Sequence, residues 1–282
     1  MLKKVILKKG KEESLLRFHP WIFSGAIADI EGCPAEGDVV DVYTSAGQWI
    51  AVGHIQVGSI AVRVLSFVQR PVDQAFWEEK LQVAFNLRTS LGLTGRSDHN
   101  IYRLVHGEGD NLPGLIVDVY GRTAVMQAHS VGMHCQRMEI AAALEKVLAG
   151  SIDSIYYKSE TTLPFKADID RGNGYIKGGP LDDVPLEYGM KMPVDWISGQ
   201  KTGLFIDQRE NRALLERCAR GCNVLNMFCY TGGFSLAALR GGASLVHSVD
   251  ASARAIELTQ GGVENNFPGD TRHKAFVQDA FR

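Results

Sequence analysis

From residue 224 onward, short apolar segments alternate with segments of helical pattern, and only a few residues separate one from the next. The apolar segments are 224–228, 245–249 and about 274–278, and helices are expected at 234–239 and from residue 253. Strands joined through helices in this way pair in parallel, because a parallel pair needs a crossover connection. The C-terminal part of the chain is therefore predicted to be an α/β domain with a Rossmann-like sheet.

The N-terminal part has a different pattern, in which short alternating strands are separated by turns. The clearest strands are 37–43, 49–54 and 60–65. Several short strands at close spacing are typical of a small β-barrel. A chain of 282 residues also exceeds what one hydrophobic core usually serves, so more than one domain is expected.

Between these two parts, helices are expected at 74–91 and 134–149, with a hairpin at 115–128. This mixture predicts a small central α+β domain. The fold class is thus multidomain. The expected boundaries are 1–72 for the β-barrel, 73–184 for the central domain, and 185–282 for a hairpin followed by the α/β domain.

Composition limits the functions that the chain can have. Thirty Lys and Arg against 32 Asp and Glu give a net charge of −2, so any binding to nucleic acid must come from local patches. The apolar runs are far shorter than the ~20 residues of a membrane-spanning helix. Five cysteines are too few and too scattered for a disulfide scaffold. We expect a cytoplasmic protein with reduced thiols and no membrane partner.

The loop after the first strand of the α/β part carries the strongest chemical signal. Phe228 and Tyr230 fill positions where a dinucleotide-binding loop needs glycine, so a pyrophosphate cofactor is disfavoured. Asp250 ends the second strand 18 residues after Gly232, a spacing at which a carboxylate can accept both hydroxyls of a ribose. Asp279 follows the third strand and can accept from an adenine amino group. A nucleoside without pyrophosphate indicates S-adenosylmethionine, although either acid alone could be a helix cap.

A second signal is a run of lysines at the N-terminus. Residues 3–11 include five lysines and no acid, interleaved with the apolar 5–7. Such a patch is typical of a surface that contacts phosphates. The alternative is a solvated edge strand that lysines protect from aggregation.

Four stretches of this sequence occur in the same order in a known family. They are HPWIFSG at 19–25, YRLVHGEGDNLPGL at 102–115, GLFIDQRENR at 203–212 and NMFCYTGGFS at 226–235. The chain resembles the large-subunit ribosomal RNA methyltransferases that carry an N-terminal PUA domain. This class I S-adenosylmethionine-dependent group is best known for a member that makes 5-methylcytosine.

The resemblance implies roles for particular residues. The cofactor would be held by Gln208, Arg209, Asn226, Phe228, Tyr230, Gly232, Gly233, Phe234, Asp250, Asp279 and Ala280. The N-terminal barrel would be the PUA-like RNA-binding domain, and its phosphate contacts would be Lys8, Lys9, Lys11 and Arg17, which position RNA without specifying sequence. The partner would be ribosomal RNA of the large subunit.

Methylation at cytosine C5 needs a cysteine thiolate that adds to C6 and a base that removes the C5 proton. The catalytic residues are not identified here, because the family takes its thiol from a later segment. Cys229 lies on the cofactor loop and is interpreted as structural. Cys218 and Cys222 are interpreted as small core residues, because no His or Cys partner at zinc-finger spacing accompanies them, and no metal is expected.

One departure from the family pattern lies in the helix after Asp250. The family usually has asparagine near position 262, where this chain has Gly261-Gly262. Each glycine costs a helix about 1 kcal/mol. The helix is therefore expected to be frayed or interrupted, with Asn265-Asn266 supplying the lost polar contact.

Only three strands of the seven in a class I methyltransferase sheet can be placed after residue 224. The chain is therefore expected to hold the N-terminal half of that domain and to be an inactive fragment. Its first strand would be an apolar edge that another chain covers, for instance in a homodimer. Three functions stay open: an RNA methyltransferase, an RNA-binding protein without catalysis, and a nucleotide-dependent oxidoreductase. The side chains at 228 and 230 speak against the third.

Overall fold

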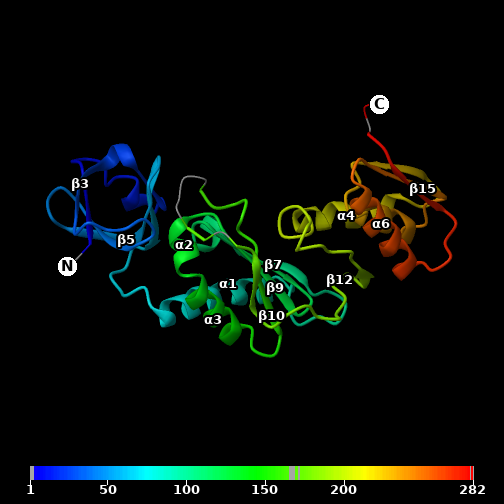
Figure 1. Cartoon of the computed structure of the whole chain (residues 1–282), viewed down its shortest axis with the longest axis horizontal. Coiled ribbons are helices and arrows are strands. Elements are labelled where there is room, and N and C mark those ends of the chain that lie inside the picture. Colours follow the sequence, from blue (N-terminus) through cyan, green and yellow to red (C-terminus); the bar gives the residue numbers. More distant parts are fainter. Residues whose placement is uncertain (1–2, 165–168, 171, 280, 282) are drawn as a thin grey trace. The chain divides into compact units, whose positions relative to one another are not determined.

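The computed structural model describes residues 3–164, 169–170, 172–279 and 281, and Figure 1 labels some of its elements. The chain divides into two compact units. The first consists of Met1–Leu91 and Arg103–Leu181, and the second of Gly92–Tyr102 and Asp182–Arg282. The first unit thus contains most of the expected β-barrel and central domain together. The boundaries at 72 and 184 stay predictions.

The N-terminal part of the first unit is a six-stranded sheet in the order β2-β6-β5-β4-β1-β3. The strands are β1 (Lys4–Leu7), β2 (Trp21–Phe23), β3 (Ile27–Glu31), β4 (Val39–Tyr43), β5 (Trp49–Ile55) and β6 (Ile60–Ser66). Alternate residues point inward, as the burial of Val5, Leu7, Val40 and Val42 shows. The strands expected at 37–43, 49–54 and 60–65 correspond to β4, β5 and β6.

The interpretation of the lysine-rich segment as an edge strand is wrong. β1 lies inside the sheet, antiparallel to β3 and parallel to β4. Lys3 and Lys4 do not simply protect an edge, because Lys3 Nζ lies 2.6 Å from Asp38 and Lys4 Nζ lies 3.5 Å from Glu31. The pairing with β4 joins residues far apart in sequence, and local pattern carries no sign of it.

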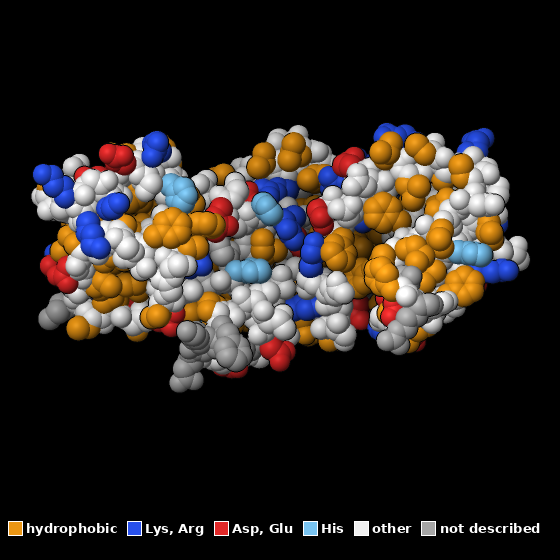
Figure 2. All heavy atoms as spheres, turned by 90° about the horizontal axis from the view of Figure 1, so that it is seen from above, with side chains coloured by type: hydrophobic (Ala, Val, Ile, Leu, Met, Phe, Trp, Pro, Cys, Tyr) orange, Lys and Arg blue, Asp and Glu red, His pale blue; other side chains and the backbone are white. Residues whose placement is uncertain are grey.

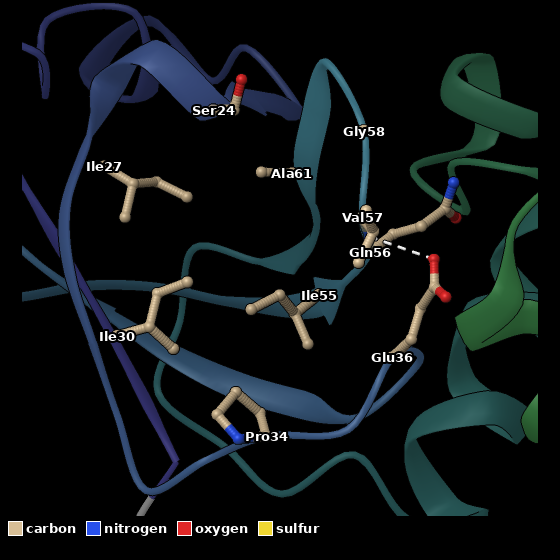
Figure 3. A pocket seen from close by; sticks show the side chains of 10 residues that line it. All are labelled: Ser24, Ile27, Ile30, Pro34, Glu36, Ile55, Gln56, Val57, Gly58 and Ala61. Atoms are coloured by element: carbon tan, nitrogen blue, oxygen red, sulfur yellow. Dashed lines mark hydrogen bonds between the residues drawn. The ribbon is translucent and has the colours of Figure 1, made fainter. Parts of the chain in front are cut away.

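An apolar hollow of about 380 Å³ lies in this sheet (Figure 3). Ile27, Ile30 and Ile55 point into it. At one side, Glu36 Oε1 accepts a hydrogen bond of 3.0 Å from the backbone N–H of Val57. The hollow is therefore mostly apolar, and one oxygen of the Glu36 carboxylate that lines it is bonded to the backbone.

The rest of the first unit is a five-stranded sheet in the order β11-β10-β9-β8-β7 with three helices. Its elements are α1 (Gln74–Ser90), β7 (Ile101–His106), β8 (Leu115–Tyr120), β9 (Thr123–Ala128), α2 (Val131–Cys135), α3 (Arg137–Val147), β10 (Ser154–Tyr157) and β11 (Gly174–Lys177). Asp73 caps α1 by accepting from the N–H of Phe76 at 3.0 Å. Phe76 and Trp77 are fully buried, and α1 packs against α3.

The second unit has the strand–helix alternation that the sequence indicates. It contains β12 (Leu186–Glu187), β13 (Met190–Lys191), α4 (Arg209–Cys218), β14 (Asn223–Met227), α5 (Gly233–Arg240), β15 (Leu245–Asp250), α6 (Ala253–Asn266) and β16 (His273–Val277). Strands β14, β15 and β16 are parallel and adjacent in that order. Figure 2 shows hydrophobic side chains over much of the visible surface of this unit. The hydrophobic side chains of Leu225 and Val277 in this unit are 62% and 56% exposed.

Helix α6 is continuous through Gly261-Gly262, so the expected interruption is wrong. A Cβ at Gly262 would lie 3.0 Å from Pro193 Cγ, which shows that the glycine lets α6 pack closely there. The side chain of Asn266 forms two hydrogen bonds with the backbone of Lys191. Its Oδ1 accepts from the Lys191 N–H at 2.9 Å, and its Nδ2 donates to the Lys191 carbonyl at 2.8 Å. It therefore fastens β13 to α6.

A buried ion pair joins β12 to α4. The guanidinium of Arg212 donates to both carboxylate oxygens of Glu187 at 2.6 Å, and both side chains are about 95% buried, with exposures of 4% and 5%. Arg212 also donates to the carbonyl of Phe205 at 2.9 Å. The pair therefore holds the segment before α4 in place.

No helix in the part of the chain that the structure describes has the length and apolar character needed to cross a membrane.

Candidate cofactor site

A cavity of about 600 Å³ lies at the carboxyl ends of β14 and β15. In open parallel sheets, ligands bind at this edge. Three segments form the cavity: the loop after β14, the start of α6 after β15, and the chain before α4. Its lining residues are Asp195, Ser198, Gly199, Gln200, Phe205, Phe228, Tyr230, Asp250, Ser252, Arg254, Ala255 and Leu258.

Asp250 ends β15 and is fixed by two backbone donors. Its Oδ2 accepts from the N–H of Tyr230 and its Oδ1 from the N–H of Ser252, both at 2.9 Å. Each carboxylate oxygen has a second lone pair, so the side chain can still accept from a ligand. Asp250 thus acts as a loop-fixing residue and offers an oriented acceptor to the cavity.

The loop after β14 holds two side-chained residues in the left-handed region. Phe228 has φ 56° and Tyr230 has φ 49°. Such conformations cost of order 1–3 kcal/mol and concentrate at functional sites. The Tyr230 hydroxyl accepts from the N–H of Gln200 at 2.9 Å and donates to the carbonyl of Gly203 at 3.2 Å. Burial raises the pKa of Tyr230, so the phenol stays protonated and keeps both bonds.

The two loop glycines serve packing. Gly232 has φ 79°, and a Cβ there would lie 2.5 Å from the Thr259 side chain on α6. A Cβ on Gly233 would lie 3.1 Å from the Arg212 side chain on α4. Neither glycine lines the cavity. They allow α5 to start close to both neighbouring helices, which places the loop.

Asp195 and Arg254 form a polar part of the cavity wall. Asp195 Oδ1 accepts from the N–H of Ser198 at 2.9 Å, and its Oδ2 lies 3.5 Å from Arg254 Nε. The Asp195 side chain is 11% exposed and that of Arg254 is 58% exposed. Gly199 closes the turn, since a Cβ there would lie 2.6 Å from the Tyr230 hydroxyl. A cavity with fixed carboxylates, a guanidinium and aromatic walls suits a zwitterionic nucleoside.

Comparisons with known proteins agree with this arrangement. A PUA-like domain model matches residues 5–67, and an S-adenosylmethionine-dependent methyltransferase model matches residues 136–272. The ribosomal RNA large subunit methyltransferase I of Erwinia tasmaniensis is 40% identical over 270 residues, which cover 94% of this chain and 67% of that protein. The chain belongs to this methyltransferase family.

A second curated relative and two solved methyltransferase structures also match this chain. The enzyme of the same name from Klebsiella pneumoniae is 39% identical over 280 residues, covering 98% of this chain and 69% of the relative. A solved structure from Streptococcus mutans, described as an S-adenosylmethionine-dependent methyltransferase, is 25% identical with a TM-score of 0.81, covering 100% of this chain and 72% of that one. Another solved methyltransferase, complexed with S-adenosylhomocysteine, has a TM-score of 0.83 at 25% identity and covers 100% and 71%.

The family assignment and its dependence on S-adenosylmethionine are therefore confirmed. The N-terminal PUA-like domain is confirmed as well. The expectation of only the N-terminal half of the methyltransferase domain gains no support from the alignments, which run along 94% and 98% of this chain. The comparisons do not identify the methylated base.

The structure brings three of the expected cofactor residues to the cavity: Phe228, Tyr230 and Asp250. The others that it describes lie outside the cavity lining: Gln208, Arg209, Asn226, Gly232, Gly233, Phe234 and Asp279. Ala280 lies outside the described residues. All eleven assignments stay predictions as cofactor contacts.

Several expected residues have local partners. Asn226 Nδ2 donates to Ser235 Oγ at 2.8 Å, Gln208 Oε1 accepts from Asn211 at 2.8 Å, and Arg209 Nε donates to Glu210 at 3.0 Å. Asp279 Oδ1 accepts from the N–H of Phe281 at 3.0 Å.

The sequence reasoning missed the segment 195–205 and the start of α6. The turn Ser198-Gly199-Gln200 was the available signal, because a Ser-Gly turn before a helix marks a tight loop.

Cys229 is buried, with its Sγ 3.9 Å from Thr259 Oγ1. Burial raises the pKa of its thiol, which disfavours the nucleophilic thiolate. This supports the structural interpretation of Cys229. Cys218 and Cys222 are exposed, so their interpretation as core residues is wrong. Within the described ranges, no group of three His, Cys, Asp or Glu side chains is placed to hold a metal ion.

The expected phosphate contacts lie on the N-terminal sheet and its first loops. Lys9, Lys11 and Arg17 are exposed. Lys8 is exposed too, but its Nζ donates to the carbonyl of Gly25 at 2.9 Å, so part of its bonding capacity serves the fold. The four residues stay predictions as RNA contacts.

Proposed function

We propose that this chain uses S-adenosylmethionine to methylate large-subunit ribosomal RNA, at C5 of a cytosine. The observation that supports the proposal best is the cavity at the carboxyl ends of β14 and β15, into which Asp250 presents a fixed carboxylate. The curated relatives bear the name of ribosomal RNA large subunit methyltransferase I. Cytosine and its C5 position are the narrower part of the proposal.

The residues of the cavity fit the chemical groups of the cofactor. The Asp250 carboxylate would accept from the two ribose hydroxyls, and the Phe228 ring, 64% exposed, would lie against the adenine. Asp195 would accept from the amino group of the methionine part, and Arg254 would donate to its carboxylate. When bound, S-adenosylmethionine supplies an electrophilic methyl group on a sulfonium. The protein's part is to orient the cofactor and to exclude water around it.

A nucleotide-dependent oxidoreductase is disfavoured. A pyrophosphate needs close approach to the backbone at a glycine-rich turn. Here the side chains of Phe228 and Tyr230 occupy that turn, and the Tyr230 ring packs edge-to-face on Phe205 with centroids 5.4 Å apart.

For RNA, the N-terminal domain would supply the phosphate contacts through Lys8, Lys9, Lys11 and Arg17. Such contacts give affinity and register without reading sequence. The target base must leave its stack to reach the methyl group. We assign no catalytic role to any of the five cysteines. We also propose a cytoplasmic location, which the five free cysteines favour.

The test is methyl transfer from radiolabelled S-adenosylmethionine to unmodified large-subunit RNA, followed by mass mapping of the labelled nucleotide. Label in 5-methylcytosine supports the full proposal, and label in another base contradicts only the choice of base. RNA binding without transfer would favour the alternative, an RNA-binding protein without catalysis. The homodimer stays a prediction that sedimentation of the same sample tests.

A further inference from the structure

Besides the candidate cofactor cavity in the second unit, the protein has a polar cavity in the first unit that the proposed function does not use. Its volume is about 220 Å³, and it is lined by Arg63 on β6, by Glu108 in the turn after β7 (Gly107–Asp110), and by His129 directly after β9. The apolar wall comes from Leu115 and Ile116 at the start of β8. Glu108 belongs to the stretch 102–115, one of the four that carry the family resemblance.

The turn that carries Glu108 is held firmly. The Asp110 carboxylate accepts from the N–H of His106 at 2.6 Å and forms a paired interaction with the guanidinium of Arg88, whose Nη2 lies 2.7 Å away. Arg88 and Asp110 side chains are only 9% and 5% exposed. Glu108 itself accepts from the indole N–H of Trp21 at 2.9 Å through Oε1. The carboxylate is thus positioned before any ligand arrives.

The cavity contains both hydrogen-bond donors and hydrogen-bond acceptors that a ligand can use. Within the described part of the chain, Glu108 Oε2 and both ring nitrogens of His129 have no hydrogen-bond partner. Arg63 Nη1 donates to Gln56 at 3.3 Å, which leaves further N–H groups of its guanidinium for a ligand. Burial lowers the pKa of His129; the charge of Glu108 opposes this effect, and the charges of Arg103 and Arg63 add to it to a smaller degree. At neutral pH the imidazole therefore has one donor and one acceptor.

This combination suits a nucleobase better than a phosphate. A carboxylate in the cavity repels phosphate but accepts from the N–H groups of a base edge. The volume is below the roughly 300–1,000 Å³ of pockets for drug-sized ligands, so it suits a single ring system. Beside the cavity stand the half-buried Trp21 and the exposed Phe23, whose rings lie edge-to-face at 6.4 Å between centroids. Unpaired RNA bases bind where such rings and base-edge partners occur together.

We propose that this cavity receives one unpaired guanine of the RNA substrate, outside the site of methylation. Guanine carries two adjacent donors, N1–H and the N2 amino group, that a carboxylate can accept together, and its O6 accepts from an arginine. Glu108 is assigned to the donor edge and Arg63 to O6. The inference rests on the proposed RNA substrate and adds a base-specific contact to it.

Fluorescence anisotropy with the full chain tests this assignment. The probes are short labelled oligouridylates that carry one central guanosine, adenosine, cytidine or uridine. The guanosine probe should bind about tenfold more tightly than the others, the effect of a hydrogen bond to a charged group. Glu108→Gln should abolish that preference. Glu13→Gln, at an exposed acid of the same unit, should leave it unchanged.

The other possible results contradict the guanine pocket, the proposed RNA substrate, or both. Equal binding of all four probes by the unmodified chain would overturn the guanine pocket and leave the proposed RNA substrate standing. No binding of any probe at low salt would contradict both. Free guanosine monophosphate that binds as tightly as the guanosine probe would overturn RNA as the source of the base. Trp21→Phe keeps a ring but removes the donor to Glu108, so it should reduce the guanine preference without reducing binding of the uridine probe.

Discussion

The buried pair of Glu187 and Arg212 gives a sharp prediction about the second unit. Glu187→Ala would leave the Arg212 guanidinium buried with the Phe205 carbonyl as its one remaining acceptor among those described. Removing one partner of a buried ion pair typically costs about 3–5 kcal/mol. For a unit of about one hundred residues, 1 kcal/mol shifts Tm by roughly 4–8 °C. Tm of the second unit should therefore fall by more than about 10 °C.

The assay is urea and thermal unfolding followed by tryptophan fluorescence. Trp196 is the one tryptophan of the second unit, and the other three in the sequence lie in the first. Replacing Trp21, Trp49 and Trp77 by Phe in the reporter chain isolates the signal of Trp196, and every variant is compared in that background. The double variant Glu187→Leu with Arg212→Met removes both charges and should recover most of the loss. A single variant within about 1 kcal/mol of the reporter chain, or a double variant as unstable as the single one, would refute the reasoning.

Three further outcomes follow from the structure. Gly232→Ala should destabilise the second unit by about 1–3 kcal/mol, because the positive φ and close packing of Gly232 exclude a side chain. Gly261→Ala, in α6 with open space at its Cβ, should stabilise the unit by about 0.5–1 kcal/mol. Urea unfolding measures both variants, and equal effects would contradict the packing argument. Burial, with the charge of Arg63, lowers the pKa of His54 to about 4, so the unfolded chain binds this proton at a higher pH than the folded chain. The stability of the first unit should therefore fall as the pH is lowered from about 6.5 to 4. His54→Leu should remove that part of the pH dependence, and an unchanged pH profile in this variant would contradict the prediction. Changing Lys9 and Lys11 together to Ala should reduce the slope of log affinity against log salt for ribosomal RNA fragments by about two units, and an unchanged slope would exclude them as phosphate contacts.

The sequence predicted the parts of the fold that depend on local pattern. The apolar segments at 224–228 and 245–249 became β14 and β15, since buried parallel strands are short apolar runs between helices. The place of Asp250 at the cavity could be predicted because the carboxyl ends of such strands meet at one edge of the sheet.

The missed features depend on contacts between distant residues. β1 pairs in parallel with β4, which no local pattern records. Helix α6 keeps Gly262 because Pro193 packs against it, so tertiary contact outweighs helix propensity. Asp195 and Asp250 are more than fifty positions apart in the sequence, and only the folded chain brings both to the cavity.

We propose that the cavity at β14 and β15 holds S-adenosylmethionine through Asp250. Isothermal titration calorimetry of the unmodified chain and of Asp250→Ala tests it directly, with Asp29→Ala, at an exposed acid of the first unit, as the control. We expect binding of S-adenosylmethionine by the unmodified chain and the control, and a loss of about 1–3 kcal/mol in the Asp250 variant. Tight binding of NADH with none of S-adenosylmethionine, or S-adenosylmethionine affinity unchanged by Asp250→Ala, would contradict the claim.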